Sequence, residues 1–374
     1  MIWVFWLAFI FITYAYLGYP LLIWGLSLLR REPILDPSHI DEWPDVVVVV
    51  AVHNEEDRVK SKVENLRSLR YPEDRLQFLF VSDGSTDATN DYLEAQQDVC
   101  LIAYPSRMGK PHALNAAMRK ATAEVVVFTD ARQTLAPDAV TFLVTRLMQP
   151  GIGAVSGDLH LHDPISHAGA HVSLYWLYEK WIRKAESRFW STAGVTGALY
   201  AIRRQDYVPL PEDTLLDDFE LPIQILHKGY RVVLESKARV FDKPQESSAG
   251  ERRRKVRTLT GNYQSFSRNV WLFSPVQNPI YFQFLSHKVF RLLIPFALLL
   301  FFAASLLLKG AIYQISFIAQ VIFYLAGMLG FLSSRLGRNR LLSFATVFIE
   351  LNWAAVVACM NFLFRRIEVR WERT

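Results

Sequence analysis

The sequence predicts an α/β domain with a mostly parallel β-sheet, flanked by membrane-spanning helices. Two observations predict this fold. Between residues 45 and 132, apolar runs of strand length alternate with segments of helical periodicity, and residues 1–29 contain no charged side chain. Strands that alternate with helices form parallel sheets through right-handed crossovers. An apolar run of 29 residues is long enough to cross the ~30 Å hydrocarbon core of a bilayer.

The composition favours a membrane protein over a nucleic-acid-binding one. Of the 374 residues, 51% are hydrophobic and 13% are aromatic, and the apolar residues are concentrated at the two ends. The net charge is only +5, and the basic residues cluster beside apolar segments. This pattern indicates contact with membrane lipids and argues against nucleic acid as a partner. Cys100 and Cys359 lie in unrelated contexts, so neither a disulfide framework nor a cysteine-based metal site is predicted.

The first apolar segment is interpreted as a retained transmembrane helix rather than a signal peptide. Arg30 and Arg31 follow the apolar run, whereas a signal peptide has its basic residues in front. The positive-inside rule then places the N-terminus outside the membrane and the two arginines inside. A charged, proline-rich linker follows at residues 30–44.

The C-terminal region contains three more apolar segments, at residues 289–308, 311–332 and 341–364. The first two are predicted to span the bilayer, because their basic flanks can both lie on the inner side. The third is also long enough, but spanning would place Arg365 and Arg366 outside, against the same rule. The third segment either spans despite that bias, turns back or lies shallow, and the sequence leaves these alternatives open.

The motif VVVFTDAR at residues 125–132 is the centre of the predicted site. Its apolar half reads as a strand buried on both faces, and Asp130 follows where the strand leaves the sheet. Asp83 ends another predicted strand in the same way, and Asp217 and Asp218 form a third acidic group. Ligands of open α/β sheets bind beyond the carboxyl ends of the strands. Three acidic groups at one edge therefore predict a site for a charged, metal-bound or proton-losing substrate.

The other elements follow from periodicity and from turn residues. An apolar spacing of three and four residues, as at Val59, Val63 and Leu66, predicts a helix, whereas uninterrupted apolar runs predict buried strands. Strands are predicted at residues 45–52, 76–81, 101–104, 125–128, 152–161 and 197–203. Helices are predicted at residues 57–69, 88–97, 110–121 and 168–188, with one more after the acidic pair that ends before Gly229.

These motifs resemble those of membrane-bound family 2 glycosyltransferases, the broad group that includes cellulose, chitin, hyaluronan and poly-N-acetylglucosamine synthases. The resemblance runs from about residue 45 to residue 257. It implies a GT-A fold, a Rossmann-like domain that transfers sugars from nucleotide diphosphates. One such motif alone is a weak signal, whereas all of them in this order are specific. They are His53-Asn54-Glu55, Ser82-Asp83-Gly84-Ser85-Thr86-Asp87, Gly109-Lys110, Ala113-Leu114-Asn115, Thr129-Asp130-Ala131-Arg132, Gly197-Ala198, Asp217-Asp218 and Arg254–Arg257.

The resemblance implies a site for the nucleotide sugar. Asp83 matches an acid that hydrogen-bonds the uracil ring, and Lys110 lies at a helix start, where a cation and free N–H groups suit a diphosphate. The alternatives are an ordinary turn at Asp83, a surface lysine at position 110 and, for residues 252–257, a basic patch that meets only the membrane surface. The predicted nucleotide-sugar site comprises His53, Asn54, Glu55, Asp83, Lys110, Asp130, Arg132, Arg254 and Arg257.

The resemblance also implies the catalytic residues. Asp217 and Asp218 match the Glu-Asp pair of the family, in which the second acid is the general base. Two adjacent acids raise the pKa of one of them, which suits a base that works near neutral pH. We therefore predict Asp218 as the base with Asp217 assisting; the alternative is a solvated helix N-terminus, which also favours acids. Asp158, Gly197 and Ala198 are predicted on the acceptor side.

Two positions depart from the family pattern. Family members usually carry Asp-x-Asp for Mg²⁺ or Mn²⁺, but this chain has Arg132 at the second acid. Because arginine cannot coordinate a cation, either Asp130 holds the metal with other help, or Arg132 supplies part of the metal's charge, or Arg132 points away. In the family's Gln-x-x-Arg-Trp motif, Arg257 matches the arginine, Arg254 replaces the glutamine and Thr258 replaces the tryptophan. Loss of that tryptophan weakens the case for a processive polymerase.

The expected function is inverting transfer of a sugar from a UDP-sugar to a membrane-associated glycan or lipid-linked acceptor in polysaccharide biosynthesis, with biosynthesis or export proteins as partners. Two alternatives remain: a single-sugar transferase to a polyprenyl-phosphate or lipid-linked oligosaccharide, and a channel or transporter subunit with a degenerate nucleotide-binding domain. The expected location is the bacterial inner membrane, with the catalytic domain in the cytoplasm. The predicted regions are helix 1–29, linker 30–44, catalytic domain 45–258, interfacial segment 259–286, transmembrane region 287–365 and basic tail 366–374.

Overall fold

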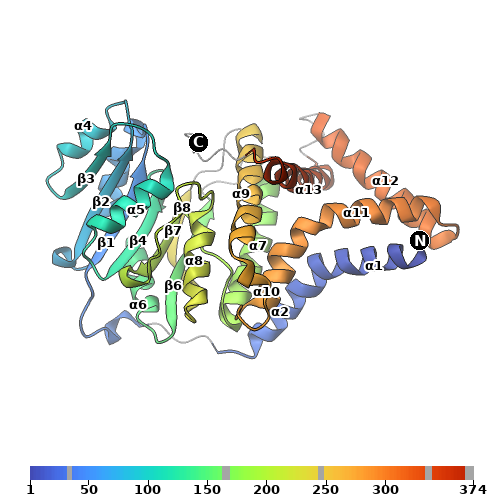
Figure 1. Cartoon of the computed structure of the whole chain (residues 1–374), viewed down its shortest axis with the longest axis horizontal. Coiled ribbons are helices and arrows are strands. Elements are labelled where there is room, and N and C mark those ends of the chain that lie inside the picture. Colours follow the sequence, from blue (N-terminus) through green and yellow to red (C-terminus); the bar gives the residue numbers. More distant parts are fainter. Residues whose placement is uncertain (32–35, 162–168, 243–247, 333–338, 367–374) are drawn as a thin grey trace.

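The protein combines one mixed β-sheet with a group of long apolar helices (Figure 1). The structure is a computed structural model that describes residues 1–31, 36–161, 169–242, 248–332 and 339–366. Eight strands form the sheet in the order β3-β2-β1-β4-β7-β6-β8-β5 among the described residues. In Figure 1 the sheet and the long helices occupy opposite ends of the molecule, with α7, α8 and α9 between them.

The first half of the sheet is parallel, as predicted. All seven residues of the first strand are buried, because helices cover both faces of the sheet there. The register pairs Ala51 with Asp130 and Val52 with Ser82, so these strands end at one edge. The strands are β1 (Val46–Val52), β2 (Leu76–Asp83), β3 (Val99–Tyr104) and β4 (Val125–Asp130), and the helices are α3 (Glu56–Arg67), α4 (Thr89–Glu94) and α5 (Lys110–Lys120).

The second half of the sheet is mixed. β7 runs antiparallel to both β4 and β6, whereas β8 is parallel to β6 and antiparallel to β5. The chain between β6 and β7 forms the long helix α7 on the side of the apolar helices (Figure 1). The elements are β5 (Thr134–Leu135), α6 (Ala139–Leu147), β6 (Ile152–Leu161), α7 (Gly169–Phe189), β7 (Leu199–Arg203), α8 (Asp217–His227) and β8 (Arg231–Asp242).

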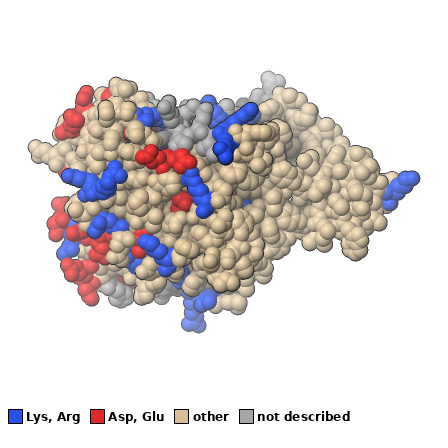
Figure 2. All heavy atoms as spheres, in the orientation of Figure 1, with Lys and Arg blue, Asp and Glu red and all other residues tan. Residues whose placement is uncertain are grey.

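Four helices within the described residues are long and apolar enough to cross a membrane. The first and second spans each include a π-helical turn. The fourth is one unbroken helix of spanning length, so the segment does not turn back within residues 340–363, and whether it spans or lies shallow stays open. Figure 2 shows charged side chains gathered over the sheet domain and few over the helices. The spans are Ile2–Leu28 (α1, Ile2–Thr13; α2, Tyr19–Leu28), Tyr281–Leu307 (α10, Tyr281–Gln283; α11, Phe290–Leu307), Ala311–Leu332 (α12) and Leu341–Leu363 (within α13, Arg340–Leu363).

Helix α9 (Ser248–Arg268) joins the sheet domain to the membrane helices. It runs without a break through the predicted boundary at residues 258/259. On one side the rings of Tyr263 and Phe362 stack 5.8 Å apart, which connects α9 to α13. On the other side a Cβ atom at Gly261 would lie 2.5 Å from Cγ of Leu216. The absence of a side chain at position 261 therefore lets α9 lie directly on the loop that precedes Asp217.

We expect Gly261→Val to destabilise the protein and to displace the loop at residues 215–216. The added methyl groups overlap Leu216, and overpacking of this kind costs about 1–3 kcal/mol. Thermal unfolding of the full chain in detergent measures the loss. Ser267→Val is the matched control, because Ser267 is an exposed position on the same helix. Equal unfolding temperatures for the two variants would contradict the close packing of α9.

Candidate active site

A cavity of about 2900 Å³ lies between the carboxyl edge of the sheet, α7, α9 and the membrane helices. Most of the residues predicted from the sequence meet there, although they come from distant parts of the chain. Asn54 and Asp83 are the two predicted residues that do not line it. The predicted residues that line the cavity are His53, Glu55, Lys110, Asp130, Arg132, Asp158, Gly197, Ala198, Asp217, Asp218, Arg254 and Arg257.

Lys110 lies between two of the predicted acidic groups. Its Nζ is 3.1 Å from Oδ1 of Asp130 and 3.2 Å from Oδ2 of Asp217. Burial alone would lower the pKa of Lys110, but the charges of Asp130 and Asp217 outweigh burial and raise it. The side chain is therefore a permanent cation that connects the end of β4 to the start of α8. The alternative of a surface lysine does not hold, because only 17% of the side chain is exposed.

Asp130 and Arg132 take part in two different ion pairs. Burial would raise the pKa of Asp130, but Lys110 and then Arg132 outweigh it and lower the pKa, so the carboxylate is charged. Nη2 of Arg132 lies 3.1 Å from Oδ2 of Asp242, at the end of β8. The side-chain amide of Gln133 donates to the same oxygen at 3.0 Å. Arg132 therefore lines the cavity while its guanidinium is anchored to the neighbouring strand.

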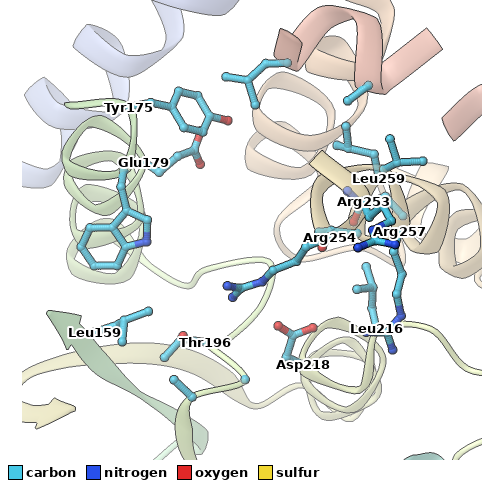
Figure 3. Close-up of a pocket in the computed structure, with 18 of the residues that line it drawn as sticks. Leu159, Tyr175, Glu179, Thr196, Leu216, Asp218, Arg253, Arg254, Arg257 and Leu259 are labelled. Atoms are coloured by element: carbon cyan, nitrogen blue, oxygen red, sulfur yellow. The ribbon is translucent and has the colours of Figure 1, made fainter. Parts of the chain in front are cut away.

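Asp218 has the environment of a general base. Burial first, and then the charge of Asp217, raises the pKa of Asp218, with Lys110 acting in the opposite direction. A Cβ atom at Gly197 would lie 3.3 Å from Oδ2 of Asp218, so glycine leaves that oxygen open to the cavity. Figure 3 shows Asp218 and Arg254 pointing into the same space from α8 and α9. A hydroxyl group placed there would meet a carboxylate able to accept its proton.

The loop before Asp217 and Asp218 is held by side chains of α9. The side-chain oxygen of Gln264 accepts from the N–H of Leu215 at 3.0 Å, and Nη2 of Arg257 donates to the carbonyl of Leu215 at 3.2 Å. The hydroxyl of Tyr200 donates to Oδ2 of Asp217 at 3.4 Å. These bonds fix the backbone and the first acid of the pair, and both Asp217 and Asp218 line the cavity.

Asp83 and Asn54 hold loops together in this structure. The carboxylate of Asp83 is fully buried and accepts N–H bonds from Met108 at 2.6 Å and Gly109 at 2.9 Å. The side-chain oxygen of Asn54 accepts from the N–H of Thr86 at 2.8 Å. Asp83 therefore positions the loop that starts α5 and presents Lys110. Its role in binding the uracil ring stays a prediction.

Sequence reasoning missed three charged residues of the site. Lys62 donates to Oγ1 of Thr129 at 3.1 Å and to the carbonyl of Gln133 at 2.9 Å. Lys180 lies 2.6 Å from Oδ1 of Asp158, on the predicted acceptor side, and Asp242 pairs with Arg132 as described. A signal for Lys62 was present, because its place between Val59 and Leu66 puts a charge on the apolar face of α3.

Burial lowers the pKa of Lys62 to about 7, although the charges of Asp130 and Asp242 oppose the shift. Around neutral pH this lysine is therefore close to the point at which it loses its proton. Lys62 lines the cavity and donates hydrogen bonds to Thr129 and Gln133, the two residues that flank the segment Asp130-Ala131-Arg132. The segment that departs from Asp-x-Asp thus contains one basic residue, Arg132, and is held at both flanks by another, Lys62.

Comparison with known proteins identifies the domain. Residues 47–208 match the model of the family described as Glycosyl transferase family 2. A probable glycosyltransferase, YdaM, of Bacillus subtilis (strain 168) is 26% identical over 238 residues, which cover 60% of this chain and 57% of that protein. Poly-beta-1,6-N-acetyl-D-glucosamine synthase of Staphylococcus aureus (strain MSSA476) is 22% identical over 249 residues, covering 64% of this chain and 59% of the relative. The matches thus span less than two thirds of these relatives.

A solved structure agrees with the whole fold. The mannosyltransferase PcManGT from Pyrobaculum calidifontis, in complex with GDP-Man and Mn²⁺, has a TM-score of 0.73 and 24% identity, and the match covers 95% of this chain and 97% of that one. The predicted GT-A fold is therefore confirmed. Residues 47–208 form a glycosyl transferase family 2 domain, as the motifs predicted. The family match ends before Asp217, so the assignment of the acidic pair as catalytic stays a prediction.

Lys62 gives a prediction about pH. Its pKa is about 7 in the folded chain against an ordinary value of 10.5, so between these pH values the unfolded chain binds more protons. The stability of the folded chain therefore rises with pH across this window. Compared with a variant that has an uncharged side chain at position 62, the parent protein is least stable below pH 7. We expect the stability of the parent protein relative to Lys62→Met to increase from pH 6.5 to pH 9.5.

Denaturation midpoints of the full chain in detergent, measured across that pH range, test this prediction. Lys60→Met is the matched control, because Lys60 is exposed on the same helix. Its difference from the parent protein should stay constant with pH. Parallel pH profiles for the Lys60 and Lys62 variants would show that the buried lysine titrates at its ordinary pKa.

Proposed function

We propose that the chain is an inverting glycosyltransferase that moves a sugar from a nucleotide diphosphate sugar, with a UDP-sugar as the first expectation, to a membrane-associated acceptor. The observation that carries this proposal is the position of Lys110. It holds a cation between Asp130 and Asp217, directly beside the candidate base Asp218. One cavity thus contains a group suited to a diphosphate and a group suited to removing a proton.

The step we propose is a single displacement. Asp218 accepts the proton of an acceptor hydroxyl as its oxygen forms a bond to the anomeric carbon. The bond from that carbon to the phosphate oxygen breaks, and the nucleotide diphosphate leaves with the electron pair. Lys110, Arg254 and Arg257 line the cavity and supply positive charge for the leaving group. Attack opposite to the leaving group inverts the anomeric carbon.

The donor class is supported by the relatives. Poly-beta-1,6-N-acetyl-D-glucosamine synthase and PcManGT are both sugar transferases by name, and PcManGT was solved with GDP-Man. We therefore expect the donor to be a nucleotide diphosphate sugar, with GDP-sugars suggested by PcManGT and UDP-sugars by the motif resemblance. Asp83, His53, Asn54 and Glu55 remain our candidates for the nucleoside side of the site.

The acceptor side favours a lipid-linked molecule. The cavity extends from Asp218 to apolar side chains of the membrane helices, and on α13 these are Phe344, Val347, Phe348 and Leu351. A lipid tail suits such a wall, whereas a long hydrophilic polymer would gain little from it. The threonine at position 258, in place of the tryptophan of processive synthases, supports transfer of a single sugar. Asp158, Gly197 and Ala198 are proposed to contact the acceptor head.

Location and partners are proposed from the same features. Four apolar helices support integration into a membrane, and the positive-inside rule supports a cytoplasmic catalytic domain. The bacterial inner membrane is proposed because the relatives are bacterial. Biosynthesis or export proteins for polysaccharides are proposed partners because of the polysaccharide synthase relative. The competing view, a channel or transporter subunit with a degenerate domain, predicts nucleotide binding without turnover.

An activity screen separates these possibilities. We expect the purified full chain in detergent to release nucleotide from one member of a panel of UDP- and GDP-sugars when membrane lipid extract is added. The labelled sugar should then partition into the organic phase, because the product carries a lipid. Recovery in a water-soluble polymer would instead favour a glycan acceptor. Nucleotide binding without release under every condition would favour the degenerate-domain view.

Asp218→Asn tests the assignment of the base. An amide cannot accept the acceptor's proton, so we expect the transfer rate to fall about 100-fold or more while the affinity for the nucleotide stays close to that of the parent. Initial rates and titration calorimetry measure the two quantities. Glu212→Gln is the control, since Glu212 is an exposed acid on the preceding loop. Loss of nucleotide affinity in the Asp218 variant would mean that this acid is structural.

A further inference from the structure

We propose that Lys110 and Arg132 replace the divalent cation at this site, so that the nucleotide diphosphate binds without a metal ion. This inference rests on the proposed function and concerns the same cavity. An intact Asp-x-Asp motif would imply a bound divalent cation. In this chain Lys110 and Arg132 lie next to Asp130 instead.

The donor set suits a divalent cation poorly, because the motif offers a single carboxylate and one of its oxygens already contacts an ammonium. Mg²⁺ requires near-octahedral oxygen coordination and usually takes one or two carboxylates besides phosphate oxygens and water. At this site Oδ1 of Asp130 is already 3.1 Å from the ammonium of Lys110, and Arg132 stands at the second acidic position. Among the described residues, no group of three or more His, Cys, Asp or Glu side chains is placed to hold a metal ion.

The arginine is a built part of the site rather than a loose surface residue. Nη2 of Arg132 is 3.1 Å from Oδ2 of Asp242, whose side chain is only 6% exposed, and Gln133 donates to that oxygen as well. Pairing of β5 with β8 brings Thr134 opposite Phe241, so the backbone holds Arg132 and Asp242 next to each other. A metal ion at Asp130 would therefore lie beside a fixed positive charge that cannot move to the solvent without breaking this pair.

Lys110 places its ammonium between the carboxylates of Asp130 and Asp217. Its ammonium has three N–H donors, and Asp130 and Asp217 account for two of them by position. The third is available to a phosphate oxygen in the cavity. The charge of Arg254 helps to lower the pKa of Asp130, and the side chain points into the cavity toward Asp218 (Figure 3). The cationic side chains of the site can therefore contact the phosphate oxygens directly.

The first test uses the unmodified full chain in detergent. Titration calorimetry with UDP and with GDP is carried out once in EDTA and once in excess Mg²⁺ or Mn²⁺. We expect at least one nucleotide to bind with Kd values that agree within about 2-fold between the two conditions. Binding that needs the metal would overturn this inference and leave the proposed function intact. Binding of neither nucleotide in either condition would overturn both.

Substitution of the lysine gives the second test. Lys110→Met should weaken binding of the same nucleotide in EDTA by about 10-fold or more, because a contact to a charged group is lost. Lys120→Met is the matched control, since Lys120 is exposed at the other end of α5. Equal Kd values for the two variants in EDTA would overturn the role of Lys110. Thermal unfolding of each variant confirms that it is folded.

A variant that restores the second acid of the Asp-x-Asp motif provides the third test. In Arg132→Asp combined with Asp242→Asn, the second acid of the motif is restored and the acid that paired with Arg132 is neutralised. We expect nucleotide binding to this variant to become metal-dependent, with a Kd in EDTA weaker than that in Mn²⁺ by about 10-fold or more. Affinity that is still insensitive to EDTA would show that Arg132 does not determine metal use.

Discussion

The contact of Lys110 with Asp130 and Asp217 is the interaction on which the site depends. It joins three elements that start or end at the same edge of the sheet, namely β4, α5 and α8. Each of the three charges would be costly to bury alone, and each offsets the cost of the others. The position of Asp218 follows from this arrangement, because Asp217 is fixed by Lys110 and Tyr200.

The support for Lys110 extends well beyond its two ion pairs. The buried carboxylate of Asp83 accepts the N–H groups of Met108 and Gly109, and so it holds the backbone from which α5 begins. Gly109 has φ +98°, a conformation that favours glycine at this start. Asp83, which is predicted to bind the nucleotide, thus also fixes the position of the Lys110 ammonium. Binding the nucleotide and holding this loop are compatible roles for Asp83. A loop that carries Lys110, the residue proposed to bind the diphosphate, must be rigid to be selective.

The sequence was sufficient for the parallel half of the fold because its strands are uninterrupted apolar runs, as in β1. It was insufficient for β8, in which Arg231, Glu235, Lys237 and Arg239 interrupt the apolar pattern of a strand covered unevenly on its two faces. The motif acids were predicted because each follows a strand or begins a helix. Lys62 and Asp242 were missed because their function depends on partners that are distant in the sequence.

Helix α9 connects the family 2 domain to the apolar helices. Gly261 brings α9 against Leu216, and Tyr263 on the same helix stacks on Phe362 of α13. Helix α9 therefore contacts both α13 and the loop before Asp217. The bonds of Gln264 and Arg257 to Leu215 add two polar contacts between α9 and the same loop. The position of Asp218, the proposed base, thus depends on the sheet, through the contact of Lys110 with Asp217, and on α9, through its bonds to Leu215.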